Sequence, residues 1–103
     1  MHRLFVVLAL AGAPGAQAAE HLVTMQDATY TPAKIEARVG DSIRFVNRDP
    51  VDHEVFVPTV GHAVDLGKQE PGKEAGLALG RPGRFEVECV FHPEMLLTVE
   101  VVP

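Results

Sequence analysis

The residues with the clearest chemical potential lie near the end of this 103-residue sequence, where Cys89, His92 and Met95 fall within seven positions of one another. Cys89 is the only cysteine in the chain. A thiolate, an imidazole and a thioether are all metal ligands, and a cysteine with two histidines and a weakly bound methionine is typical of an electron-transfer copper site. His53, which ends the run that begins at Asn47, supplies the second histidine. The sequence therefore predicts a metal site built from His53, Cys89, His92 and Met95.

The spacing of these residues favours copper over other metals. Four residues from Cys89 to His92 can form one tight turn, whose end Cα atoms lie within about 7 Å, so that both side chains reach one ion. Zinc also uses Cys and His, but a thioether is a poor ligand for it. An iron–sulfur cluster needs more cysteines than one. No catalytic dyad is evident, so we expect a copper protein that is not an enzyme.

The segments between these residues are typical of short strands. Residues 34–39 alternate charged and apolar side chains, which indicates a half-buried strand, and Gly40-Asp41 then turns the chain. Glycine and proline punctuate the later runs, and no segment shows a helical period. The sequence predicts one all-β domain, a sandwich or small barrel. Its further strands are expected at residues 42–48, 54–57, 84–91 and 96–102.

Residue parity predicts that three polar side chains point into the core. His53 and Asn47 each share a strand face with apolar neighbours, and Cys89 does so at the end of its strand. The face of Cys89 is expected to include Phe85, Val87 and Phe91. We also expect His53, on a distant strand, to tie the two sheets of the sandwich together.

Three acidic residues near the first ligand, Asp49, Asp52 and Glu54, are expected to form solvated loop surface.

The amino terminus is typical of an export signal. A short basic start, an apolar run of about ten residues and Ala16-Gln17-Ala18 predict a signal peptide over residues 1–18, with cleavage after residue 19 as the alternative. The run is too short to span a membrane, which takes about 20 residues. Residues 19–103 would then form the single mature domain, a monomer in the periplasm.

The charge of that mature chain bears on its partners. It contains eight basic and fourteen acidic residues, a formal charge of −6. The absence of a Lys/Arg cluster argues against nucleic acid or an anionic membrane. We expect a redox partner protein with a basic docking patch.

Taken together, the copper loop, Tyr30-Thr31-Pro32, the Val39-Gly40-Asp41 turn and the strand end at residues 45–49 resemble the cupredoxins. These are the type 1 (blue) copper proteins of the plastocyanin/azurin family, and the Cys-x2-His-x2-Met loop is most similar to that of the amicyanins.

The resemblance implies a Greek-key β-sandwich of about seven or eight strands, with one copper ion and one-electron transfer. It also implies His53, Cys89 and His92 as equatorial ligands, Met95 as the axial one, and an Asn47 amide that bridges the two ligand-bearing segments and steadies the Cys89 loop.

One alternative function is copper binding for tolerance or delivery, and a third hypothesis is a metal-free β-sandwich interaction domain. Cleavage after Ala18 would place His21 third in the mature chain, where it could complete an amino-terminal chelate of Cu(II). His62 is a further possible donor, although an exposed loop position explains it equally well.

Overall fold

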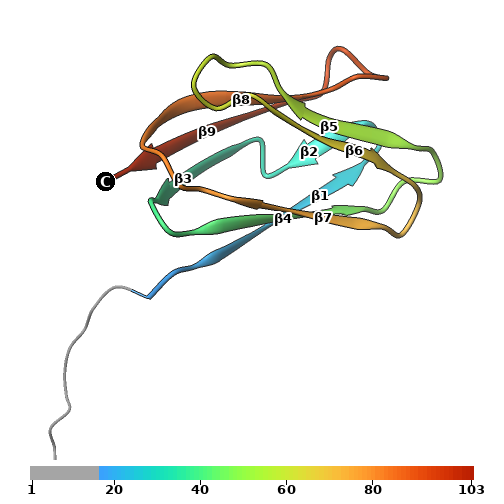
Figure 1. Cartoon of the computed structure of the whole chain (residues 1–103). Coiled ribbons are helices and arrows are strands. Elements are labelled where there is room, and N and C mark those ends of the chain that lie inside the picture. The colour runs from blue at the N-terminus through green and yellow to red at the C-terminus, as the bar shows by residue number, and fades with distance from the viewer. Residues whose placement is uncertain (1–16) are drawn as a thin grey trace, which may run out of the picture.

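The computed structural model describes residues 17–103, which form nine strands and no helix (Figure 1). The strands in chain order are β1 (Glu20–Gln26), β2 (Thr29–Thr31), β3 (Lys34–Arg38), β4 (Ser42–Asn47), β5 (His53–Val57), β6 (Val64–Gln69), β7 (Glu74–Ala78), β8 (Gly83–Cys89) and β9 (Leu96–Val102).

These strands form two sheets that pack face to face. One sheet has the order β2-β1-β4-β7 and the other the order β3-β9-β8-β5-β6. The pairs β1–β4 and β3–β9 are parallel, and the remaining pairs are antiparallel. The all-β sandwich predicted from the sequence is confirmed, with nine strands in the described residues in place of the expected seven or eight.

Alternating burial explains why these segments are strands. In β3 and β4 every second residue is buried, so each strand presents one apolar face to the space between the sheets. The core that results includes Val23, Met25, Tyr30, Ile43, Phe45, Val55, Val57, Phe85, Val87, Leu97 and Val99. Four strands have no counterpart among the predicted segments: β1, β2, β6 and β7. Of these, β6 and β7 lie at sheet edges, and Gln69 is their single buried residue, so they lack a regular pattern of buried and exposed side chains.

The prediction for the last residues of β8 was partly wrong. The strand ends at Cys89, which is buried, and Phe91 is 48% exposed instead of sharing the inward face. The chain turns here, because His92 N donates a 3.3 Å hydrogen bond to Cys89 O. The alternation of inward and outward side chains therefore ends with the strand at Cys89, and Phe91, in the turn that follows, lies at the surface.

At the opposite end of the sandwich, the buried carboxylate of Asp41 ties the start of β1 to the turn between β3 and β4. It accepts hydrogen bonds from Ala19 N (2.9 Å), Arg38 N (3.0 Å) and His21 Nε2 (2.9 Å). The hydrogen bonds from Ala19 N, Arg38 N and His21 stabilise the charged form and lower the pKa of Asp41 from 3.8 to about 2.

This shift predicts a pH-dependent contribution to stability. Because the pKa is lower in the folded protein, the contribution is fully present above pH 3.8 and is lost as the pH falls towards 2. We expect Asp41→Asn to lower the unfolding temperature at pH 7, and the difference from the wild type to shrink as the pH falls from about 4 to about 2. Glu36→Gln, at an exposed position of β3, is the control. A wild type–Asp41→Asn difference that stays constant down to pH 2 would contradict the assignment.

Within residues 17–103 no helix has the length and apolar character needed to cross a membrane. The predicted signal peptide falls almost entirely on residues 1–16, outside the described residues, and stays a prediction. The first strand begins at Glu20, one or two residues after the expected cleavage points.

Candidate metal centre

Two of the predicted ligands, His53 and Cys89, lie on neighbouring strands of the five-stranded sheet. His53 is the first residue of β5, Cys89 is the last of β8, and the two strands pair directly, with Val55 opposite Cys89. His92 comes from the loop that follows β8. The expectation that His53 ties the two sheets together was wrong, because β5 and β8 belong to the same sheet.

Three donor atoms from these residues converge on one point. His53 Nδ1 lies 3.2 Å from His92 Nδ1, and Cys89 Sγ lies 3.6 Å from His53 Nδ1 and 3.7 Å from His92 Nδ1. His53 and Cys89 are buried, and His92 is half-exposed. Within residues 17–103 this is the one group of three or more His, Cys, Asp or Glu side chains arranged to hold a metal ion.

The separations fit a shared metal. With bonds of about 2.0 Å to nitrogen and about 2.3 Å to sulfur, a trigonal centre separates its nitrogens by about 3.5 Å and each nitrogen from the sulfur by about 3.7 Å. The observed distances of 3.2, 3.6 and 3.7 Å match this triangle, with a slightly narrow angle between the histidines. A buried thiolate with two imidazoles suits copper, and the donors present therefore fit the ion that the sequence suggested.

Met95 lies immediately after this triangle and is fully buried, at 1% exposure. Its backbone N–H donates a 2.9 Å hydrogen bond to His92 O, which closes a second tight turn before β9 begins at Leu96. The Met95 side chain is thus part of the core and follows directly after the loop that carries His92.

The surroundings of Cys89 fix the position of its sulfur. Glu54 N donates a hydrogen bond to Cys89 Sγ at 3.4 Å, so the backbone of β5 supports the sulfur directly. The neighbouring carbonyl, Glu88 O, accepts a 2.8 Å bond from Tyr30 Oη. Burial raises the pKa of Tyr30, which keeps the hydroxyl protonated as a donor. That bond joins β2 of one sheet to β8 of the other beside the site.

Asn47 is buried as predicted, but its contacts differ from the expectation. Its amide nitrogen donates to Val51 O (2.9 Å) and Gln69 O (2.8 Å), and its Oδ1 accepts from Asp49 N (2.9 Å). Asn47 therefore steadies the segment that leads to His53 and anchors it to the end of β6. The expected bridge to the Cys89 loop is absent from its described hydrogen bonds, and the sulfur of Cys89 is contacted by Glu54 N of β5 instead.

Asp49 is a residue of the candidate site that the sequence did not predict. It was expected on solvated loop surface, but it is only 7% exposed and its Oδ2 lies 2.7 Å from His53 Nε2. The signal was available, since the inward parity of Phe45 and Asn47 continues to position 49. Burial acts to raise the pKa of Asp49, but hydrogen bonds from Ala28 N, His53 and Asp27 N outweigh it, and the net pKa is lowered.

The two extra histidines lie away from the cluster. His21 lies on β1 and bonds to Asp41, and the backbone of Glu20 and His21 is paired with β4, so an amino-terminal chelate would require this end of β1 to detach. His62 is half-buried in the loop after β5, at the opposite end of that strand from His53.

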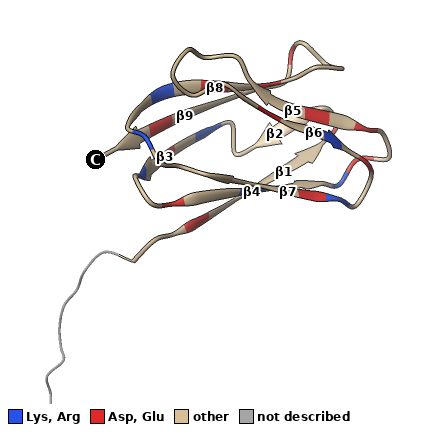
Figure 2. Cartoon of the chain, in the orientation of Figure 1, with Lys and Arg blue, Asp and Glu red and all other residues tan. Residues whose placement is uncertain are grey.

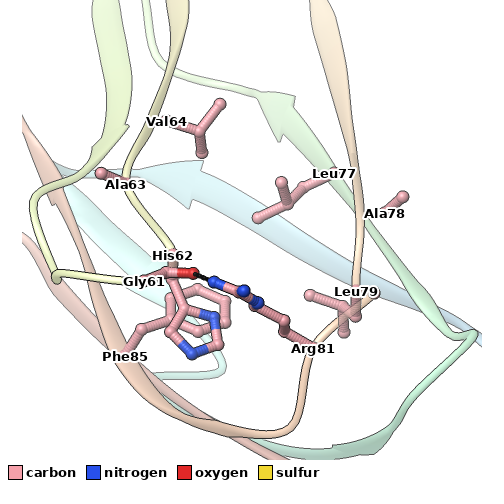
Figure 3. Close-up of a pocket in the computed structure, with 10 residues that line it drawn as sticks. Gly61, His62, Ala63, Val64, Leu77, Ala78, Leu79, Arg81 and Phe85 are labelled. Atoms are coloured by element: carbon pink, nitrogen blue, oxygen red, sulfur yellow. Dashed lines mark hydrogen bonds between the residues drawn. The ribbon is translucent and has the colours of Figure 1, made fainter.

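Packing accounts for the position of His62. Its ring stacks on Phe85 with centroids 4.9 Å apart, while Arg81 Nη1 donates to Gly61 O beside it (Figure 3). A Cβ at Gly83 would lie 2.9 Å from His62 Nε2, so glycine is required opposite the ring. His62 is thus one of the residues that line a separate pocket between β6 and β7.

Comparisons with known proteins agree with this geometry. The sequence matches the cupredoxin-like domain over residues 2–101. It is 32% identical over 76 residues to the methylamine utilization protein MauL of Methylophilus methylotrophus, covering 71% of this chain and 44% of that protein. The MauL protein of Methylorubrum extorquens is 30% identical over 87 residues, covering 84% of this chain and 76% of the relative. The chain therefore spans less than half the length of the first of these relatives.

Solved structures share the fold. A Cu(I) form of an amicyanin variant superposes with a TM-score of 0.73 at 24% identity, covering 84% of this chain and 85% of that one. A purple cupredoxin from Nitrosopumilus maritimus gives a TM-score of 0.71 at 19% identity, covering 79% and 98% of the two chains. The family match extends over almost the whole sequence, and it includes all of the residues that form the donor triangle. The chain belongs to the family of cupredoxin-like domains.

Proposed function

We propose that this protein binds one copper ion through His53, Cys89, His92 and Met95 and carries single electrons between redox partner proteins. The observation that supports this most directly is the triangle of His53 Nδ1, His92 Nδ1 and Cys89 Sγ, with sides of 3.2, 3.6 and 3.7 Å. Bound copper would supply a one-electron couple between Cu(II) and Cu(I), with a donor protein supplying the electron and an acceptor protein removing it. No substrate is turned over in this proposal.

The chain's own residues would keep the ligands still during transfer. His53 and Cys89 are held by paired strands, and two successive backbone turns fix His92 and Met95. A rigid ligand framework that changes little between oxidation states minimises the movement that each electron transfer requires. In this proposal Met95 is the weak axial ligand, which tunes the potential more than it holds the metal.

The half-exposed ring of His92 would be the point of electron entry and exit. Exposed apolar side chains occur in the loops before β5 and after β8 and at the start of β9: Val51, Val90, Phe91 and Leu96. Acidic residues occur in the same segments, with Glu54 on β5 and Glu94 in the loop before β9. Figure 2 shows acidic stretches on β5 and in the loop between β8 and β9. Such a surface suits transient contact with a partner whose docking patch is apolar at its centre and basic at its rim.

Ionic strength should therefore control the exchange rate. With a formal charge of −6 on residues 19–103, association with a basic redox protein is expected to slow by roughly tenfold or more between low salt and about 0.5 M salt, as screening weakens the attraction. Stopped-flow oxidation by a basic c-type cytochrome measures this. A small anionic oxidant is the control and should show the opposite trend. Equal cytochrome rates at all salt concentrations would instead point to a purely apolar docking face.

We favour the electron carrier over copper tolerance or delivery, because the donors that would support a second copper are engaged elsewhere. His21 bonds to Asp41 and His62 stacks on Phe85. We also propose that the protein works in the periplasm as a monomer, after removal of residues 1–18.

The deciding experiment is to load the metal-free protein with one equivalent of Cu(II), record its visible spectrum and measure its reduction potential. An intense thiolate-to-copper absorption and a reversible one-electron couple are expected. A colourless protein that binds only zinc, or several weakly held copper ions with no reversible couple, would rule out the proposed function.

A further inference from the structure

The carboxylate of Asp49 contacts residues of both sheets, and one of these residues is the candidate ligand His53. Asp27 N donates to its Oδ1 at 2.6 Å, Ala28 N donates to its Oδ2 at 2.9 Å, and His53 Nε2 lies 2.7 Å from the same Oδ2. Asp27 and Ala28 form the turn between β1 and β2 in the four-stranded sheet, whereas His53 begins β5 in the other. Asp49 is therefore a further link between the sheets at this end of the molecule, beside the hydrogen bonds of Tyr30 and Asn47.

The hydrogen-bond roles in this contact fix the proton on the imidazole. An ionised carboxylate can only accept, and this one already accepts from two backbone N–H groups. His53 Nε2 must then carry the ring proton and donate it. In the neutral ring, Nδ1 is left with a free lone pair, and Nδ1 is the atom that faces Cys89 Sγ and His92 Nδ1.

The carboxylate is rigid and shielded from water, so its charge acts strongly on the centre. The side chain of Asp49 is 6% exposed and that of His53 is fully buried. Two backbone donors hold the carboxylate against a turn whose residues have φ angles of 55° and 51°. A fixed negative charge one imidazole away from a bound metal favours the more positively charged oxidation state.

We propose that Asp49 is a positioning residue that holds His53 in its Nε2–H tautomer with Nδ1 ready to bind, and that its charge lowers the reduction potential of the bound copper. The second half of this inference rests on the proposed function; the first half does not, because the tautomer exists in the metal-free protein.

The first test uses the metal-free wild type. Nitrogen-15 NMR of the imidazoles should show His53 protonated at Nε2 and unprotonated at Nδ1. In Asp49→Asn the ring should lose this preference and populate both tautomers. A wild-type His53 protonated at Nδ1 would overturn the proposal, whether or not any variant folds.

The second test compares two variants that each remove one negative charge beside His53. Asp52 precedes His53 in the sequence, is 42% exposed at its side chain and lies 3.8 Å from Lys68 Nζ. Asp49→Asn should shift the potential upwards and weaken Cu(II) binding by roughly 10–100-fold. Asp52→Asn should change both much less, and Asp49→Glu, which retains a carboxylate, should fall between the wild type and Asp49→Asn.

Other outcomes separate the possible failures. Equal shifts in Asp49→Asn and Asp52→Asn would mean that only overall charge matters and would overturn the positioning role. A lower unfolding temperature in Asp49→Asn, with an unchanged tautomer of His53 and an unchanged reduction potential, would mean that Asp49 only stabilises the fold. This result would also overturn the positioning role. If the wild type gives no reversible copper couple, the proposed function fails while the NMR result still decides the tautomer.

Discussion

Replacing Cys89 by alanine is expected to abolish the visible absorption of the copper-loaded protein completely. The absorption in question is a charge transfer from thiolate sulfur to copper, and Cys89 is the only cysteine in the chain, so no other residue can replace the donor. The two imidazoles and the weakly binding thioether of Met95 would remain, and residual Cu(II) bound there should be pale and far less tightly held. Visible spectroscopy and a copper titration of the purified variant measure both effects.

The matched comparison is Met95→Gln, which changes the other sulfur of the site. The thioether of an axial methionine contributes less to binding than the equatorial ligands, so this variant should retain one copper and a visible band while its potential and colour change. A coloured Cys89→Ala protein would contradict the ligand assignment. Loss of all copper from Met95→Gln would contradict the axial role of Met95.

The second large effect concerns the core that holds the ligand strands. Phe45 on β4 is fully buried, and its ring meets Tyr30 edge-on with centroids 5.9 Å apart and an interplanar angle of 67°. Phe45→Ala removes this packing and leaves a cavity, so we expect the free energy of unfolding to fall by about 3–5 kcal/mol. Domains of this kind have only about 5–15 kcal/mol in total, and the metal-free variant should be close to unfolding.

Chemical denaturation of the metal-free protein measures this loss, with Val60→Ala as the control. Val60 is 93% exposed, and its replacement should change the free energy of unfolding by no more than about 0.5 kcal/mol. Added copper should raise the unfolding midpoint of Phe45→Ala, because a ligand that binds only the folded state stabilises it. A loss below about 1 kcal/mol would mean that the core between the sheets tolerates the cavity by collapsing around it.

The candidate metal site could be predicted from the sequence because three of its four residues are close together in the chain. Cys89, His92 and Met95 are joined by so short a loop that their side chains cannot be far apart, whatever the rest of the chain does. Alternation along the strands similarly gave the inward positions of Asn47, His53 and Cys89, since side chains on a strand alternate between its two faces.

The contacts of those residues were not predictable in the same way. The pairing of β5 with β8, which brings His53 beside Cys89, joins residues 34 to 36 positions apart in the chain. Period-two patterns state which face a residue occupies but not which strand lies next to it. The hydrogen bond between Asp49 and His53 was not predicted for another reason. A charged side chain in a loop is expected to be exposed to solvent, because its burial is costly unless hydrogen-bond donors compensate it. The donors here, Asp27 N and Ala28 N, are known only from the tertiary structure.

The sequence by itself determined the ligand types, their order and the all-β framework, because these follow from residue chemistry and from spacings of a few residues. Only the tertiary structure decided which carboxylate contacts His53 and which backbone carbonyls accept hydrogen bonds from Asn47. It also decided that His21 and His62 lie away from the candidate metal site. Those features depend on burial and on contacts between strands from different sheets. They arise when the whole chain packs, and the one local signal for any of them is the parity of residues 45–49, which indicates that Asp49 is buried.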